Sequence, residues 1–137
     1  MPELLTEVGP LSDATTNGVR VEVMARPSKE HSKPQVGEWV FEYTVRITNL
    51  GEDAVTLVSR HWLISNASGN VREVKGPGVI GQQPLLKSGE SFQYSSWSRI
   101  DTPTGTMRGT YQFIGDVREE FDAEVAPFAL RAKYTVH

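Results

Sequence analysis

Three glycines have the spacing best suited to chemistry in this sequence. Gly76, Gly78 and Gly81 form the pattern G-x-G-x-x-G within VKGPGVIGQQP. In dinucleotide-binding proteins this pattern lies between a strand and a helix, and the free N–H groups of the helix bind the pyrophosphate. Here the following residues, QQPLLKSGES, contain a proline and a glycine and leave no room for a helix. The pattern therefore predicts sharp turns between two strands rather than a nucleotide fold.

A smaller anion site remains an alternative for the same loop. Exposed N–H groups of Gly78, Val79 and Gly81 can form a nest for pyrophosphate or a nucleotide, and lysines lie on both sides of the loop. The candidate binding loop consists of Gly76, Gly78, Val79, Gly81 and Gln83.

Histidine offers a second candidate site. Of His31, His61 and His137, no two have metal-ligand spacing such as H-x-H or H-x-x-x-H. His61 lies within a predicted strand between Arg60 and Trp62. We interpret these three neighbours as candidate surface contacts for a partner, and we predict no metal site around them.

Carboxylates offer a third possibility, because hard cations prefer oxygen ligands. The segment GDVREEFDAE contains five acidic residues but no D-x-[DN]-x-[DN]-G order. We therefore expect a solvated hairpin tip, and divalent-cation binding remains an alternative. No G-x-S-x-G elbow or other catalytic pattern is present, so we predict that the protein is not an enzyme.

Composition limits the class of protein. The chain has 137 residues, no cysteine and a formal charge of -3 from 14 basic and 17 acidic residues. One domain of this length can bury a core without disulfides. The acidic balance argues against nucleic-acid binding, and no apolar run is long enough to span a membrane. We expect a cytoplasmic protein without a cofactor, because the start, MPELLTE, also lacks the features of a signal peptide.

Extended elements must position these candidates. Apolar and polar residues alternate with period two, and turn residues separate the segments about every ten residues. The predicted strands cover 19–25, 39–49, 55–65, 71–74, 92–100, 106–114 and 121–130. This spacing predicts an all-β antiparallel sandwich over residues 18–137. Residues 1–17 are rich in turn formers and are predicted to form a flexible N-terminal leader.

Three of these segments have irregular patterns. The run 55–65 has apolar residues on both faces, which indicates a bulge or burial on both sides. Trp97 falls out of phase with Phe92 and Tyr94, so we expect a bend there and a buried indole ring. Pro127 lacks an N–H for a sheet ladder and indicates an edge strand or a strand end.

The chain from about residue 18 to residue 130 resembles the ApaG family, called CorD in some members. The resemblance is carried by SRHWLIS, by TPTGTMRGTYQFI and by the pattern G-x-G-V-x-G-x-Q-P-x-L-x-x-G-E, which begins at Gly76. One departure is Ser88, where a proline is common. The resemblance implies a sandwich of the fibronectin type III or immunoglobulin-like kind and implies no catalytic site. The name CorD associates the family with magnesium and cobalt handling, and the name ApaG reflects gene proximity to a diadenosine-tetraphosphate hydrolase.

Our leading hypothesis is a non-enzymatic binding module that holds another protein through a sheet face or an edge strand. Related domains in eukaryotic F-box proteins and in a DNA-polymerase-delta-interacting protein suggest the same role by resemblance. An exposed edge can also pair with a second copy, so the sequence allows a homodimer. The alternative is a binder of small anions or divalent cations, and a nucleotide-polyphosphate hydrolase ranks third because no carboxylate cluster supports it.

Overall fold

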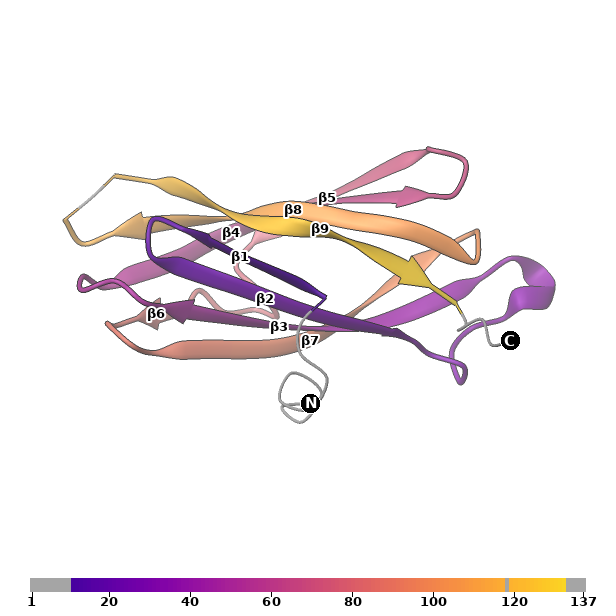
Figure 1. The fold of residues 1–137 in the computed structure, drawn as a ribbon, viewed down its shortest axis with the longest axis horizontal. Helices are drawn as coiled ribbons and strands as arrows, with labels where there is room; N and C mark the ends of the chain where they lie inside the picture. Colours follow the sequence, from indigo (N-terminus) through magenta and orange to yellow (C-terminus); the bar gives the residue numbers. More distant parts are fainter. Residues whose placement is uncertain (1–10, 118, 133–137) are drawn as a thin grey trace.

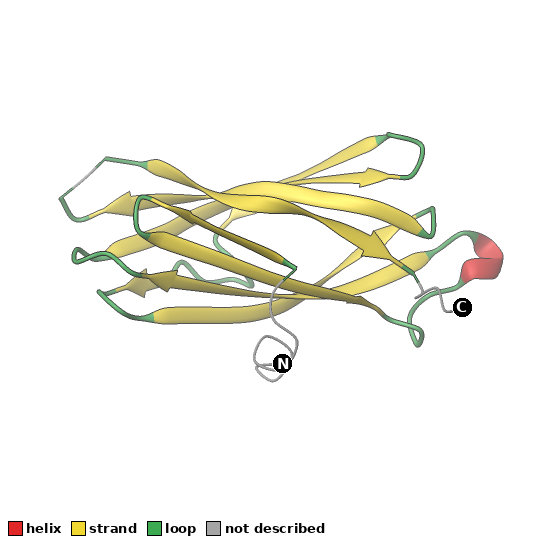
Figure 2. Cartoon of the chain, in the orientation of Figure 1, coloured by secondary structure: helices red, strands yellow, loops and turns green. Residues whose placement is uncertain are grey.

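A computed structural model describes residues 11–117 and 119–132. The described chain forms two antiparallel sheets that pack face to face (Figure 1), and strands make up most of it (Figure 2). One short 3-10 helix, η1 (Pro34–Val36), interrupts the strands. This arrangement confirms the predicted antiparallel β-sandwich.

The first sheet has the strand order β1-β2-β3-β7. Its strands are β1 (Ser12–Thr16), β2 (Val19–Pro27), β3 (Trp39–Asn49) and β7 (Ser91–Ile100). The second sheet has the order β5-β4-β8-β9, and β6 pairs with the beginning of β4. Its strands are β4 (Val55–Asn66), β5 (Val71–Pro77), β6 (Leu85–Leu86), β8 (Thr104–Gly115) and β9 (Phe121–Arg131).

The core lies between the sheets and follows the predicted alternation. In β3, Phe41, Tyr43, Val45 and Ile47 are buried, and they face buried residues such as Trp62 from the second sheet. Large apolar side chains at period two on both inner faces supply the hydrophobic stabilisation of a sandwich. Most loops between strands lie at the two ends of the molecule, whereas the segment between β5 and β6 passes along its middle (Figure 1).

The three segments with irregular sequence patterns differ in how well the structure agrees with their predictions. The ladder between β4 and β8 shifts register between Leu57 and Ser59, which confirms the predicted bulge. Pro127 lies in β9, at the edge of its sheet, as predicted. The prediction for Trp97 was wrong, because β7 pairs with β3 without a register shift and the indole is 52% exposed. Its ring contacts His31 edge to face at 4.8 Å, so the outer face of the first sheet holds this tryptophan.

The predicted boundary between leader and domain falls inside a hairpin. Ser12–Thr16, expected to belong to the leader, form β1 and pair with Val19–Val23 of β2. The turn between them is Asn17–Gly18, and both residues have positive φ, as a two-residue hairpin turn requires. That part of the leader prediction is wrong, because the Asn17–Gly18 turn folds the preceding residues back onto β2 as a paired strand. Residues 1–10 lie outside the described residues.

Three tyrosines form a polar group inside the core. The hydroxyl groups of Tyr94 and Tyr111 lie 2.5 Å apart, and the hydroxyl group of Tyr43 bonds Ser96. Burial raises the pKa of all three phenols, most strongly for Tyr111, and neighbouring phenols add to the rise in the pKa of Tyr94 and Tyr111. The folded protein therefore holds these hydroxyl groups neutral.

This burial predicts a loss of stability in alkali. An unfolded tyrosine releases its proton near pH 10.0, whereas the folded state retains it. The free energy of unfolding should therefore fall as the pH rises above 10, by up to about 4 kcal/mol per pH unit for three such groups. Urea unfolding between pH 8 and pH 11 measures this slope. Tyr94→Phe should flatten it by about a third, and an unchanged slope would show that Tyr94 already ionises in the fold.

Candidate functional site

The glycine loop closes on itself rather than on a ligand. The N–H of Gly78 donates to the carbonyl of Val58 at 2.7 Å, and the N–H of Val79 donates to the carbonyl of Gln82 at 2.8 Å. Gln82 returns a bond to Val79 at 2.9 Å, so Ile80 and Gly81 form a tight turn, both with positive φ. Two of the three amides expected to bind an anion are thus already used.

The spacing of the glycines has a structural cause. A Cβ on Gly78 would lie 2.1 Å from the carbonyl oxygen of Gln82, and a Cβ on Gly76 would touch the guanidinium of Arg60. The side chain of Val79 is fully buried, and Gln83 donates its amide to the carbonyl of Val58 at 2.8 Å. The loop therefore packs against β4 and inserts one apolar side chain into the core, which is the role of the G-x-G-x-x-G pattern here.

Arg60, His61 and Trp62 do not form one surface. Successive residues of a strand point to opposite faces, so Trp62 turns inward, is 2% exposed and packs against the rings of Tyr43 and Tyr111. The prediction that Trp62 is a surface contact is therefore wrong. The Arg60 guanidinium donates to the carbonyls of Pro77 and Gly78 at 3.1 and 2.9 Å, and so it holds the glycine loop.

His61 alone of the three lies on the outer face of the second sheet. Its Nε2 lies 2.6 Å from a carboxylate oxygen of Glu73, and the ammonium of Lys75 lies 3.8 Å from the same oxygen. The carboxylate offsets the positive charge of Lys75. Ser59 and Gln112 complete a shallow polar depression there.

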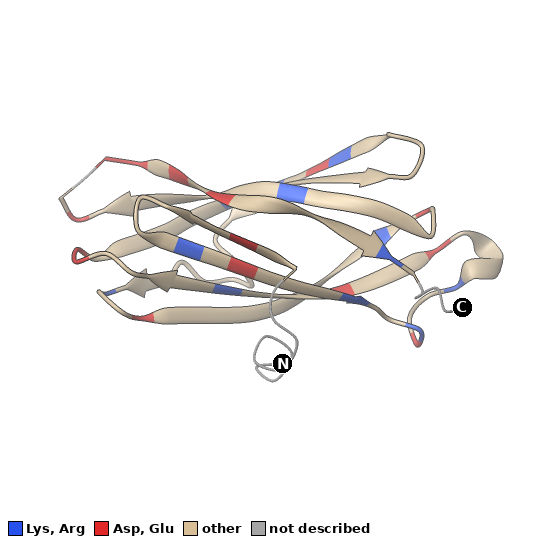
Figure 3. Ribbon diagram, in the orientation of Figure 1, with Lys and Arg blue, Asp and Glu red and all other residues tan. Residues whose placement is uncertain are grey.

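The acidic hairpin does not gather ligands. Within residues 11–117 and 119–132, no group of three or more His, Asp or Glu side chains is placed to hold a metal ion. Basic and acidic residues are interspersed over both sheets of the described chain (Figure 3).

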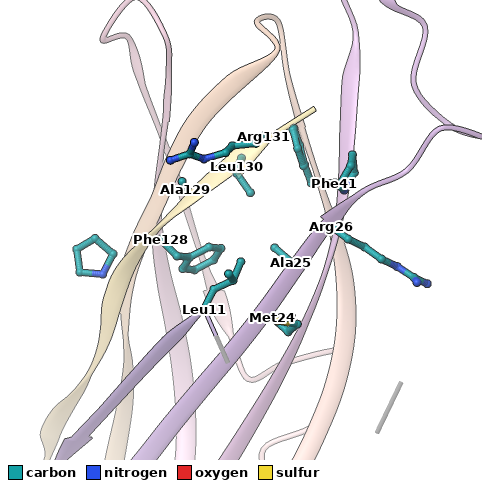
Figure 4. Close-up of a pocket in the computed structure, with 11 residues that line it drawn as sticks. Leu11, Met24, Ala25, Arg26, Phe41, Phe128, Ala129, Leu130 and Arg131 are labelled. Carbon is teal, nitrogen blue, oxygen red and sulfur yellow. The ribbon is translucent and has the colours of Figure 1, made fainter. Parts of the chain in front are cut away.

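A groove that the sequence analysis did not identify lies between β2 and β9. It has a volume of about 730 Å³ and is lined mainly by apolar side chains (Figure 4). Phe128 and Leu130 of β9, Phe41 of β3 and Leu11 contribute to it, and Met24 and Ala25 of β2 form the opposite wall. Arg26 and Arg131 extend from its rim.

One side of the groove is an edge of β2 that no described strand covers. Strand β1 pairs only with Val19–Val23, and the carbonyl of Val23 accepts a bond from the N–H of Leu11. Backbone groups of every second residue in a strand point to the same edge. The next groups of β2 that point to the β1 side are therefore the N–H and C=O of Ala25 and the C=O of Pro27. No described strand pairs with Ala25–Pro27 on that side.

The other side is an edge of β9. The N–H of Ala132 donates to Pro103, at the start of β8, so the backbone groups of Ala129 and Arg131 are directed away from β8. Further along, β1 joins the two edges: the hydroxyl of Ser12 donates to the carbonyl of Ala126 at 2.6 Å, and the N–H of Glu124 donates to the hydroxyl of Thr16 at 3.1 Å. The groove is therefore the continuation of the position that β1 occupies.

The cations at the rim differ in their partners. Arg26 pairs with Glu42 at 3.0 Å. Arg131 has no carboxylate within ion-pair distance among residues 11–117 and 119–132. None of the described acidic residues lines the groove, so it favours a ligand that carries negative charge.

The groove was hidden in the sequence because it depends on pairing between distant segments. Two local signals were present: Pro127, which marked β9 as an edge, and the Asn17–Gly18 turn, which sets the register of β1 on β2.

Comparisons with known proteins agree with the fold. A family model described as the ApaG domain matches residues 29–115. Proteins named ApaG are 45% identical in Dechloromonas aromatica, over 89% of this chain and 98% of that protein, and 45% identical in Stenotrophomonas maltophilia, over 93% of this chain and 100% of that protein. A crystal structure described as an ApaA protein, from Bordetella pertussis, has a TM-score of 0.83 at 45% identity and covers 85% of this chain and 95% of its own.

A more distant structure, the C-terminal domain of wzt, has a TM-score of 0.56 at 10% identity and shares the fold alone. A search of the described residues for a helix with the length and hydropathy of a membrane span gave none.

Proposed function

Because this chain belongs to the ApaG family, we propose that it is a non-enzymatic module that binds an extended segment of another protein. The segment adds as a strand in the groove between β2 and β9. Strand addition takes affinity from main-chain hydrogen bonds and specificity from alternate side chains. The protein then acts by holding its partner.

The observation that carries this proposal is a pair of strand edges, on either side of an apolar groove, that pair with no strand among residues 11–117 and 119–132. The outward groups of Ala25 on β2 and of Ala129 and Arg131 on β9 are donors and acceptors for a strand, and Phe128 and Leu130 provide an apolar floor. Strand β1 already pairs with the neighbouring stretch of β2, and the hydroxyl groups of Ser12 and Thr16 bond the backbone of β9.

The charges around the groove indicate which kind of segment it can bind. Arg131, which pairs with none of the described carboxylates, stands at the rim beside Arg26, which pairs with Glu42, and none of the described carboxylates lines the groove. A segment that alternates apolar residues with at least one Asp or Glu complements this surface. The proposal does not extend to pyrophosphate or to magnesium and cobalt, because two of the three loop amides are used within the fold and the described residues of the acidic hairpin gather no ligand set. A cytoplasmic location, which the absence of cysteine suits, belongs to the same proposal.

A peptide library tests the proposal. Random peptides of about ten residues, displayed on phage, are selected against the full chain, and fluorescence anisotropy then measures the affinities of the selected sequences. Ala129→Pro removes an N–H directed into the groove while leaving the bonds to β8 intact. We expect it to weaken binding about tenfold or more, which corresponds to the loss of one or two main-chain bonds.

Ala129→Ser is the matched control, because it keeps the N–H and the small side chain. It should bind with the affinity of the wild type. Equal affinity for Ala129→Pro and Ala129→Ser, or a selection that yields no peptide, would overturn the proposal. A second copy as occupant would appear as a dimer in the free protein that Ala129→Pro converts to monomer, and this result would also overturn it.

A further inference from the structure

We infer that the bound segment begins with a large apolar side chain, preferably aromatic, which enters a second pocket at the open end of the groove. A carboxylate lies within about two residues of this anchor. The inference rests on the proposed function, because it assigns the sequence of the segment that the groove would take.

The second pocket adjoins the groove through Pro27, which lines both. Its volume is about 480 Å³, and Pro34, Trp39, Pro103 and Ala132 form most of its apolar wall. Ala132 follows Arg131, the last residue of β9, so a strand that leaves the groove at this end meets the pocket directly. Pockets of this kind, lined by proline and aromatic side chains, favour large flat apolar groups.

The pocket is formed before any ligand binds. The hydroxyl of Ser32 donates to the carbonyl of Ser28 at 2.6 Å and accepts the N–H of Val40 at 2.9 Å. The N–H of Ser28 also donates to the carbonyl of Val40 at 2.8 Å. These bonds fix the loop after β2 against the start of β3, so binding costs little ordering of this wall.

Strand direction places the anchor at the N-terminal end of the segment. Strand β1 is antiparallel to β2. It is also antiparallel to β9, because Ser12 reaches Ala126 and Thr16 reaches Glu124. A segment that continues the line of β1 in the same direction pairs antiparallel with both edges. Its first residues then lie beside Pro27 and Ala132, where the pocket is.

The position of the carboxylate follows from two cations. Lys29 lines the pocket, and Arg131 stands at the groove end nearest to it. Among residues 11–117 and 119–132, no carboxylate lies within ion-pair distance of either side chain. An Asp or Glu next to the anchor therefore meets two cations that form no ion pair with the described carboxylates.

The test uses the selected peptides and the full chain. We expect an aromatic or large aliphatic residue to be enriched at the N-terminal end of the shared motif, with an acidic residue within about two positions of it. Ala132→Phe, which fills the pocket, should weaken these peptides about tenfold, and Ala132→Ser should not. Replacing the peptide's anchor by alanine should have the same effect, and the two changes should not add, because they remove one contact.

Lys29→Glu should weaken the acidic peptides about fivefold in low salt and much less in about 0.5 M NaCl. Peptides that lose affinity with Ala129→Pro but not with Ala132→Phe would overturn this inference while leaving strand addition intact. A motif with its large residue at the C-terminal end would overturn the strand direction. Indifference to Ala129→Pro would count against the proposed function itself.

Discussion

Gly78→Ala should lower the free energy of unfolding by about 3 kcal/mol or more. Two costs add at this position. The φ of 56° lies in the left-handed region, which costs an alanine about 1 kcal/mol or more. The new Cβ would also lie 2.1 Å from the carbonyl oxygen of Gln82, so the tight turn must open, and the overpacking costs about 1–3 kcal/mol. Urea unfolding measures the change.

Gly81→Ala is the matched control in the same loop. Its φ of 78° carries the same backbone strain, but no atom lies within 4 Å of the added Cβ. We expect a loss of about 1 kcal/mol. Equal losses at the two positions would contradict the close packing derived for Gly78. The pair also separates the two interpretations of G-x-G-x-x-G, because a phosphate cradle needs both glycines for binding, whereas the observed turn needs Gly78 mainly for stability.

The difference between these two glycines shows which features of the loop can be predicted from the sequence alone. The missing helix after Gly81 was readable from Pro84 and Gly89, because proline and glycine disrupt helices regardless of the tertiary fold. The close approach of Gly78 to Gln82 was not readable, because the pattern gives the spacing of glycines but not which of them meets another backbone. Local chemistry therefore predicted the class of the loop, and tertiary packing decided the role of each residue.

The same difference between local sequence pattern and tertiary packing explains why the groove and the exposed position of Trp97 were not predicted. Period-two alternation predicted the strands, their inner faces and the sandwich. It did not predict which edges stay unpaired, because strand order and pairing length arise from contacts between distant segments. Trp97 was expected inside, at a bend, because it falls out of phase with Phe92 and Tyr94. In the structure, the unbroken register of β7 directs it outward, and a contact with His31 covers part of the ring.

Trp62→Ala should be the most damaging single substitution on β4, with a loss of about 3–5 kcal/mol in the free energy of unfolding. Its indole is 2% exposed, and its ring centre lies 5.5 Å from that of Tyr43, 5.9 Å from Tyr111 and 6.2 Å from Phe128. Truncation leaves a cavity between the two sheets. Thermal unfolding should show a fall in Tm of about 10–20 °C.

His61→Ala is the control. The His61 side chain lies on the outer face, so its removal should lower the free energy of unfolding by less than about 1 kcal/mol. The contact between Trp62 and Phe128 also links the core to the floor of the groove. Trp62→Phe should therefore recover part of the stability and part of the affinity for groove peptides together, since both depend on support beneath Phe128. A Trp62→Ala protein with the stability of the wild type that binds no peptide would instead make this tryptophan a direct contact.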